Sequence, residues 1–130
     1  MSEDDCTPAF KALVKNRRLT GVMFIHSWVT LFFKGEEKSE DVITIYSRIT
    51  VEKLKHQYAT GEAGFRDKLC ELIGESIAEV SSNKTHFTFV FKNKTKLLFE
   101  LSMPDDPCPE VAFGDFGGQL IAFMNEHGED

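Results

Sequence analysis

The chain has 130 residues, of which 42% are hydrophobic, and its 21 acidic and 15 basic side chains give a formal net charge of −6. This length predicts a single domain over residues 1–130, frayed at residues 1–6 and 126–130. The negative charge disfavours non-specific binding to nucleic acids or to anionic membranes, so we expect neither as a partner.

The cysteines and the start of the chain bear on the compartment. The chain has three cysteines, Cys6, Cys70 and Cys108, which lie far apart in the sequence. An odd number of cysteines without close spacing is untypical of a disulfide framework or a zinc site. We interpret Cys70 as a small packed residue. Residues 1–5 are acidic where a signal peptide would be basic, and no apolar run reaches membrane-spanning length. We therefore expect a cytoplasmic protein without a metal or a cofactor.

The first third of the chain predicts a helix followed by strands. Thr7-Pro8 is a helix-start signal, so we expect a helix over about residues 8–17, or else a loosely packed arm. The basic cluster at residues 15–18 would be the solvated end of that helix. Residues 22–33 read as one long strand, or as two short ones bent at Ser27, and residues 41–48 as the returning strand.

The middle of the chain contains one ambiguous segment and one clear helix. The spacing of apolar residues in residues 51–60 fits a helix, but the segment could instead extend the sheet. Of these interpretations we prefer a loop or a short strand. Residues 61–73 carry an amphipathic stripe and end at Gly74, which predicts a helix. The stripe consists of Phe65, Leu69, Leu72 and Ile73.

Residues 83–101 predict a β-hairpin rich in phenylalanine. Phe87, Phe89 and Phe91 alternate on one face, and Asn93 is a favourable turn residue. We expect Phe89 and Phe91 to be buried against the apolar stripe of the helix at residues 61–73.

The C-terminal part contains a loop and a final apolar segment. Three prolines within residues 104–109 exclude helix and interior strand. A short strand over residues 110–113 and a turn at 114–118 follow. Residues 119–124 fit a strand better than a short helix, and we expect them either to pair inside the sheet or to form a homodimer contact.

Together these elements predict an α+β fold, a mainly antiparallel sheet with one or two packed helices. Leu19-Thr20-Gly21 recurs as Leu72-Ile73-Gly74, and each copy is followed by strand-like residues that end in Phe-Lys, at 33–34 and 91–92. This pattern indicates a pseudo-duplicated helix–hairpin unit with an insertion near residues 81–84, although unrelated hairpins of similar composition would look alike.

The same pattern resembles a group of small uncharacterised bacterial proteins, some of which are similar to immunity proteins encoded beside polymorphic toxins. The residues that carry the resemblance are Leu72, Gly74, Ile77, Val80, Phe89, Phe91, Leu98 and Leu101. The resemblance implies a protein partner, a toxin that is often a basic nuclease, which surface carboxylates would meet. It implies no catalytic residues.

The residues that could carry chemistry are scattered. The four histidines lack metal-ligand spacing, and no serine or cysteine has a recognisable base beside it in the sequence. We therefore expect a non-catalytic protein-interaction module. The alternative is a small-ligand binder or an enzyme whose site forms only in three dimensions, around His26, Tyr46 and Arg48. A deep cleft that joins a histidine or arginine to carboxylates would favour the alternative, and a filled core with a flat acidic face would favour the interaction module.

Overall fold

The computed structural model describes residues 14–26, 28–35, 40–104, 106, 108–116 and 118–125. These residues form ten strands and one short helix, α2 (Phe65–Cys70). The strands are β1 (Arg18–Ile25), β2 (Trp28–Lys34), β3 (Glu40–Ile45), β4 (Ile49–Lys53), β5 (His56–Ala59), β6 (Ile77–Ser82), β7 (His86–Phe91), β8 (Lys96–Glu100), β9 (Glu110–Phe116) and β10 (Gln119–Met124). Most of the helix predicted at residues 8–17 lies outside the described residues.

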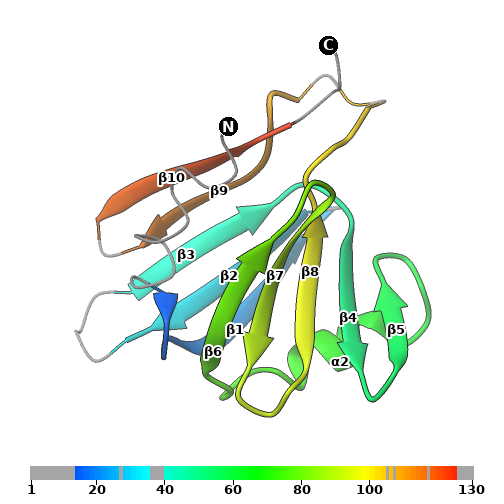
Figure 1. Cartoon of the computed structure of the whole chain (residues 1–130), viewed down its shortest axis with the longest axis vertical. Helices are drawn as coiled ribbons and strands as arrows, with labels where there is room; N and C mark the ends of the chain where they lie inside the picture. The colour runs from blue at the N-terminus through cyan, green and yellow to red at the C-terminus, as the bar shows by residue number, and fades with distance from the viewer. Residues whose placement is uncertain are drawn as a thin grey trace.

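The strands form two antiparallel sheets that face each other as two layers (Figure 1). One sheet has the order β1-β2-β3-β9-β10 and the other has the order β5-β4-β8-β7-β6. The predicted antiparallel sheet is confirmed in this coarse form. However, the described chain is nearly all sheet, so helix contributes less than the α+β prediction implied.

The core lies between the two sheets. Alternate residues point inward, as the buried face of each strand requires. Phe33 in β2 contacts Phe89 in β7, and Phe123 in β10 contacts both Phe87 in β7 and Phe99 in β8, with ring centroids 5.0–5.9 Å apart. Phenylalanine therefore joins the layers, and its burial provides much of the hydrophobic stabilisation.

The predicted burial of Phe89 and Phe91 is confirmed, but the aromatic rings that contact Phe89 come from strands. Helix α2 packs against β1, β4 and β5. Leu69 and Leu72 join the buried cluster, whereas Ile73 is 44% exposed and does not complete the predicted stripe. The helix is shorter than predicted because the chain tightens after Cys70 into turns, with Leu72 N–H donating to the Leu69 carbonyl and Ile73 N–H to the Cys70 carbonyl, and reaches Gly74 at φ 99°.

The ambiguous segment at residues 51–60 contributes to two strands, β4 and β5. The turn between them, Leu54-Lys55, has φ values of 53° and 75°, which is the geometry of a type I′ hairpin turn. Residues 22–33 also belong to two strands, β1 and β2. Gly114 lies inside strand β9, so the predicted turn at residues 114–118 begins later.

The two sheets have equivalent strand orders. Strands β1, β2 and β3 of one sheet occupy the same places as β6, β7 and β8 of the other. The remaining two places are filled by β9 and β10 in the first sheet and by β4 and β5 in the second. The register agrees as well. Leu19 pairs with Phe33 as Ile77 pairs with Phe91, and each pairing precedes a shift of one residue. We refer to β1–β5 as the first half and β6–β10 as the second half.

Four hydrogen bonds join the halves where β1 meets β6, and they occur as two equivalent pairs. Leu19 N–H donates to the Glu75 carbonyl and Ile77 N–H to the Arg17 carbonyl. Asn16 N–H donates to the Ile77 carbonyl, as Gly74 N–H does to the Leu19 carbonyl.

This register corrects the repeat that the sequence suggested. Residues of β1 and β2 match those 58 positions later in β6 and β7, the same separation as between the two Phe-Lys pairs. Leu19-Thr20-Gly21 therefore corresponds to Ile77-Ala78-Glu79, and no insertion at residues 81–84 is required. Gly74 corresponds to Asn16, and both have positive φ.

Two side-chain predictions are wrong. Arg17 is buried, and its Nε lies 2.9 Å from Oδ2 of the fully buried Asp41, so this member of the basic cluster is not solvated, whereas Lys15 and Arg18 are exposed. A methyl group at Gly35 would overlap the Arg17 guanidinium, which explains the glycine there. Cys70 is exposed rather than packed.

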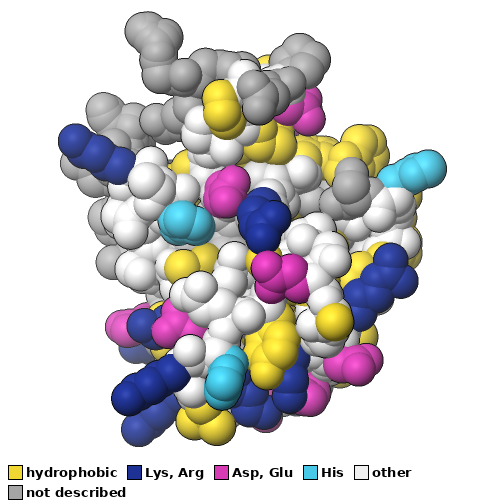
Figure 2. All heavy atoms as spheres, turned by 90° about the vertical axis from the view of Figure 1, so that its right-hand side faces the viewer, with side chains coloured by type: hydrophobic (Ala, Val, Ile, Leu, Met, Phe, Trp, Pro, Cys, Tyr) yellow, Lys and Arg dark blue, Asp and Glu magenta, His cyan; other side chains and the backbone are white. Residues whose placement is uncertain are grey.

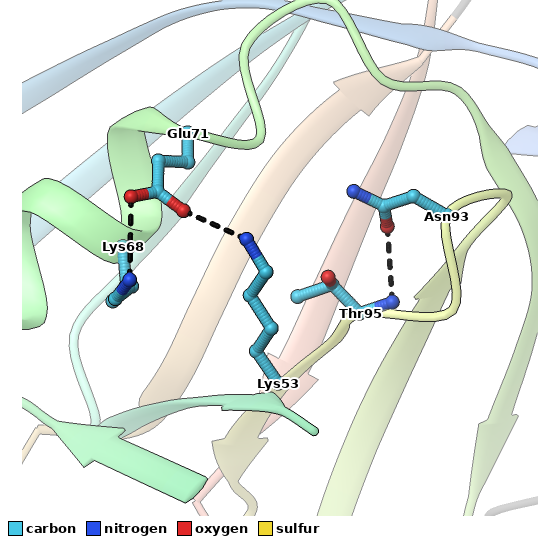
Figure 3. Close-up of polar contacts among 5 residues, drawn as sticks. All are labelled: Lys53, Lys68, Glu71, Asn93 and Thr95. Atoms are coloured by element: carbon cyan, nitrogen blue, oxygen red, sulfur yellow. Dashed lines mark hydrogen bonds and ion pairs between the residues drawn. The ribbon is translucent and has the colours of Figure 1, made fainter.

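Polar contacts connect α2 to the sheet and order the β7–β8 turn (Figure 3). Glu71 Oε1 accepts a hydrogen bond from Lys53 of β4 at 3.0 Å, and Oε2 accepts one from Lys68 of α2 at 3.4 Å. These lysines hold the pKa of Glu71 below its usual value. In the turn, Asn93 Oδ1 accepts from the Thr95 N–H at 3.0 Å, as expected for a turn asparagine.

Candidate functional site

A hollow of about 510 Å³ lies where the tip of the β1–β2 hairpin meets residues 60–67. Strand β1 ends at Ile25 and β2 begins at Trp28, so only two residues connect them. His26 opens this turn with φ 54°, and Phe24, His26 and Trp28 of this hairpin all line the hollow.

Aromatic and apolar side chains form much of the wall. Phe24, Trp28 and Val29 contribute from the hairpin and Phe65 from the start of α2. Val29 and Phe65 also belong to the buried core, whereas Trp28 is 46% exposed. The wall of the hollow therefore combines buried apolar side chains with a partly exposed aromatic one.

Charged groups surround the opening. The Arg66 guanidinium lies over the Phe24 ring, 4.9 Å from its centroid. Glu62 Oε1 accepts a hydrogen bond from the Ala59 N–H at 3.0 Å, and its Oε2 lies 3.5 Å from Nη2 of Arg48. Both side chains of this ion pair are about half exposed, so water screens it. The carboxylate of Asp67 also lines the hollow.

The three residues predicted as a site lie around this hollow but relate to it differently. His26 lines it directly. Tyr46 meets Trp28 edge to face, with ring centroids 5.0 Å apart and planes at 79°. Arg48 reaches the hollow through its ion pair with Glu62.

The environment of Tyr46 changes its acidity. Partial burial raises the pKa of its phenol above 10.0, and the negative charges of Glu110 and Cys108 contribute further. The hydroxyl therefore stays protonated at neutral pH and remains available as a hydrogen-bond donor.

Sequence reasoning missed Trp28, Glu62 and Arg66. Trp28 could have been noticed as the sole tryptophan, beside a two-residue turn. Glu62 and Arg66 had no signal, because they meet the hairpin only after long-range pairing places residues 60–67 beside it.

The arrangement is suited to binding. Aromatic rings, an arginine and carboxylates lie around buried apolar side chains, a combination found at protein interfaces and at ligand sites. Within the described part of the chain, no group of three or more His, Cys, Asp or Glu side chains is placed to hold a metal ion.

The outer surface of the same hairpin is unusually apolar. Met23, Ile25 and Trp28 are 45%, 42% and 46% exposed, and we call them the hairpin-tip surface. Val29, Leu31 and Phe33 of β2 belong to the buried core cluster, whereas Met23, Ile25 and Trp28 do not, so the core does not require the hairpin-tip residues to be apolar.

The equivalent hairpin of the second half provides an internal reference. By the matched register, Met23, Ile25 and Trp28 correspond to Ser81, Asn83 and His86. There the tip is polar and internally hydrogen-bonded. Asn83 Oδ1 accepts from the Thr85 N–H at 2.7 Å, from the Thr85 hydroxyl at 2.9 Å and from the His86 N–H at 2.9 Å.

The side of the molecule that carries α2, β4 and β5 is mixed in character (Figure 2). Acidic and basic side chains are mixed there with small hydrophobic patches. This side is therefore not the flat acidic face that we expected of an interaction module.

Comparisons of the chain with models of known protein families, with curated proteins and with solved structures found no match. No helix in the described residues is long and apolar enough to span a membrane.

Proposed function

We propose that this chain is a non-catalytic protein-interaction module that binds its partner through the hairpin-tip surface. The observation that carries the proposal is the internal comparison of the two hairpins. The same register accommodates Ser81, Asn83 and His86 in one half, so Met23, Ile25 and Trp28 are not required by the fold. Exposed apolar side chains without a structural need mark a surface that gains by association.

The residue types around the tip support this proposal. Tryptophan, tyrosine, methionine and arginine are enriched at interfaces, where a few of them contribute most of the binding energy. Trp28 is positioned as such a residue, because Tyr46 holds its ring edge to face and the hollow lies beside it. Arg48 and Arg66 would lie at the polar rim.

The resemblance to immunity proteins supports a toxin as the partner, and the net charge of −6 supports a basic one. Glu62 and Asp67 line the hollow together with Trp28 of the proposed surface. Attraction between them and a basic partner would raise the association rate and weaken with added salt.

The test is binding to the protein encoded beside this chain in its genome, measured by calorimetry at fixed ionic strength. Ile25→Ala and Trp28→His should each weaken binding at least about tenfold, because each removes apolar contact area. Ile73→Ala is the matched control, since Ile73 is 44% exposed against 42% for Ile25 but lies outside the surface.

All three variants should melt like the original chain, because each site is substantially exposed. If Ile73→Ala weakens binding as much as Ile25→Ala does, the hairpin-tip surface is not the interface.

A second candidate function is the binding of a small ligand, and the hollow is the observation that favours it. Its volume of about 510 Å³ falls in the range of small-molecule sites, and it joins His26 and Arg66 to two carboxylates. A fragment screen by NMR would test it. Hits that shift the resonances of Phe24, Phe65 and Arg66, and that are lost in Arg66→Ala, would support this function.

The matched register also supports the proposal that both halves descend from one helix–hairpin unit. An alignment of homologues would test this. Within each relative, the residues of the β1–β2 hairpin should resemble the residues 58 positions later in the β6–β7 hairpin. If the two hairpins share nothing beyond strand composition in any relative, convergence explains the register.

A further inference from the structure

The two halves of the fold end in edge strands, β5 and β10, that occupy equivalent places in their sheets. An edge strand presents unpaired backbone groups, which invite pairing with another strand unless they are protected. The two edges differ in this respect.

Strand β5 is protected in several ways. It has only four residues, and the turn that leads into it contains Lys55 and directly follows Lys53. Helix α2 packs against it, with the Lys68 ammonium 5.5 Å from the centroid of the Tyr58 ring. Its position Gln57 is polar and exposed. Short length, nearby lysines and a covering helix are known ways to block edge pairing.

In the part of the chain that the structure describes, strand β10 has none of these features. It has six residues and carries no charge. Within the described residues, no strand lies beyond it and no helix packs against it. Leu120, which corresponds to Gln57, is 68% exposed, and Met124 at the end of the strand is 55% exposed.

We propose that β10 pairs antiparallel with β10 of a second copy of this chain, so that the two β1-β2-β3-β9-β10 sheets join into one continuous sheet. A two-fold axis places a strand opposite itself, and a charged strand would then face like charges. The uncharged sequence Gln119–Met124 avoids this repulsion at every register. Leu120 of each copy would lie near the same residue of the other, which removes exposed apolar surface from water.

The dimer interface is separate from the proposed partner surface. The hairpin-tip surface lies on β1 and β2, at the opposite edge of the sheet from β10. Each copy would therefore keep its partner surface, and the two proposals can fail independently.

The net charge of each copy predicts how the dimer responds to salt. Two chains of −6 repel each other, so moderate salt should strengthen association by screening. Binding of a basic partner would respond in the opposite direction.

The experiment is sedimentation of the full chain over increasing concentration, alongside Leu120→Lys and Gln57→Lys. The original chain should shift from monomer to dimer, and Leu120→Lys should raise the dimer dissociation constant at least about tenfold, because it places like charges across the axis. Gln57→Lys puts the same charge at the equivalent position of β5 and should leave the dimer unchanged. Circular dichroism should report a folded chain in each case, since both sites are exposed.

Two results would overturn the proposal. The first is a monomer at every concentration up to the solubility limit. The second is a dimer that Leu120→Lys and Gln57→Lys affect equally, which would place the contact elsewhere.

Discussion

The first half of the chain, β1–β5, and the second half, β6–β10, have the same strand order and register but differ in how they treat equivalent positions. Most positions that face the core are apolar in both halves. Leu31 corresponds to Phe89 and Ile45 to Phe99, and all four are buried.

Positions facing solvent differ instead. The first half has an apolar hairpin tip and a protected edge, whereas the second has a polar tip and an apolar edge. The comparison teaches that the core determines only the inward residues. The outward residues were free to differ, so the apolar ones among them are the best indication of what this protein contacts.

The largest expected effect tests whether the halves share one core. Phe89→Ala should cost about 3–5 kcal/mol and the equivalent Leu31→Ala about 2–5 kcal/mol, because each opens a cavity between the sheets. Urea unfolding followed by circular dichroism and by the fluorescence of Trp28, the sole tryptophan, would measure both.

Both probes should shift together in Phe89→Ala, although Trp28 lies in the other sheet from Phe89. A fluorescence midpoint that stays in place while the circular dichroism midpoint falls would mean that the sheets unfold separately.

The next effect concerns a buried position at which the halves use different chemistry. Asp41 pairs with Arg17, while the equivalent residue, Thr95, is buried without an ion pair. Asp41→Ala should destabilise by about 3–5 kcal/mol, because it leaves the Arg17 guanidinium buried without its carboxylate. Thr95→Ala should cost less, about 0.5–3 kcal/mol. Thermal unfolding of both variants would rank them, and equal losses would show that the ion pair is not the cause.

The smallest effect concerns the contact by which α2 is held to β4. Hydrogen bonds from Lys53 and then Lys68 lower the pKa of Glu71 below 4.5. Because the folded-state pKa is lowered, this contribution to stability is present above pH 4.5 and is lost as the pH falls through the folded-state pKa. Lys53→Met should move the pKa of the Glu71 carboxyl, followed by NMR, back towards 4.5. A pKa unchanged in Lys53→Met would mean that the contact does not persist in solution.

Much of the fold could be predicted from the sequence. Phe87, Phe89 and Phe91 alternate with polar or smaller residues, and that alternation correctly predicted a strand with one buried face. The strand at residues 119–124 was also predicted correctly, because its glycine-rich flank favours a hairpin. These are local patterns, and local patterns report which face of a strand is apolar.

The candidate site could be predicted only in part. His26, Tyr46 and Arg48 were singled out, and all three lie around the hollow or beside its walls. Trp28 was overlooked because an isolated tryptophan has no periodic pattern. The β4–β5 hairpin was ambiguous because its turn uses Leu54 and Lys55 at positive φ, where glycine or asparagine would be the usual signal.

The sequence by itself determined the inward and outward faces of the strands and the presence of a helix near residues 61–73. The tertiary structure decided which sheet each strand joins. Strand β4 leaves β3 and pairs with β8, while β9 leaves β8 and pairs with β3, so each half completes the sheet of the other. Side-chain alternation is a property of neighbouring residues, whereas this exchange depends on pairing between residues that are 44 to 50 positions apart for β4 with β8 and 67 to 73 for β3 with β9. The same exchange places residues 60–67 beside the β1–β2 hairpin and so forms the hollow.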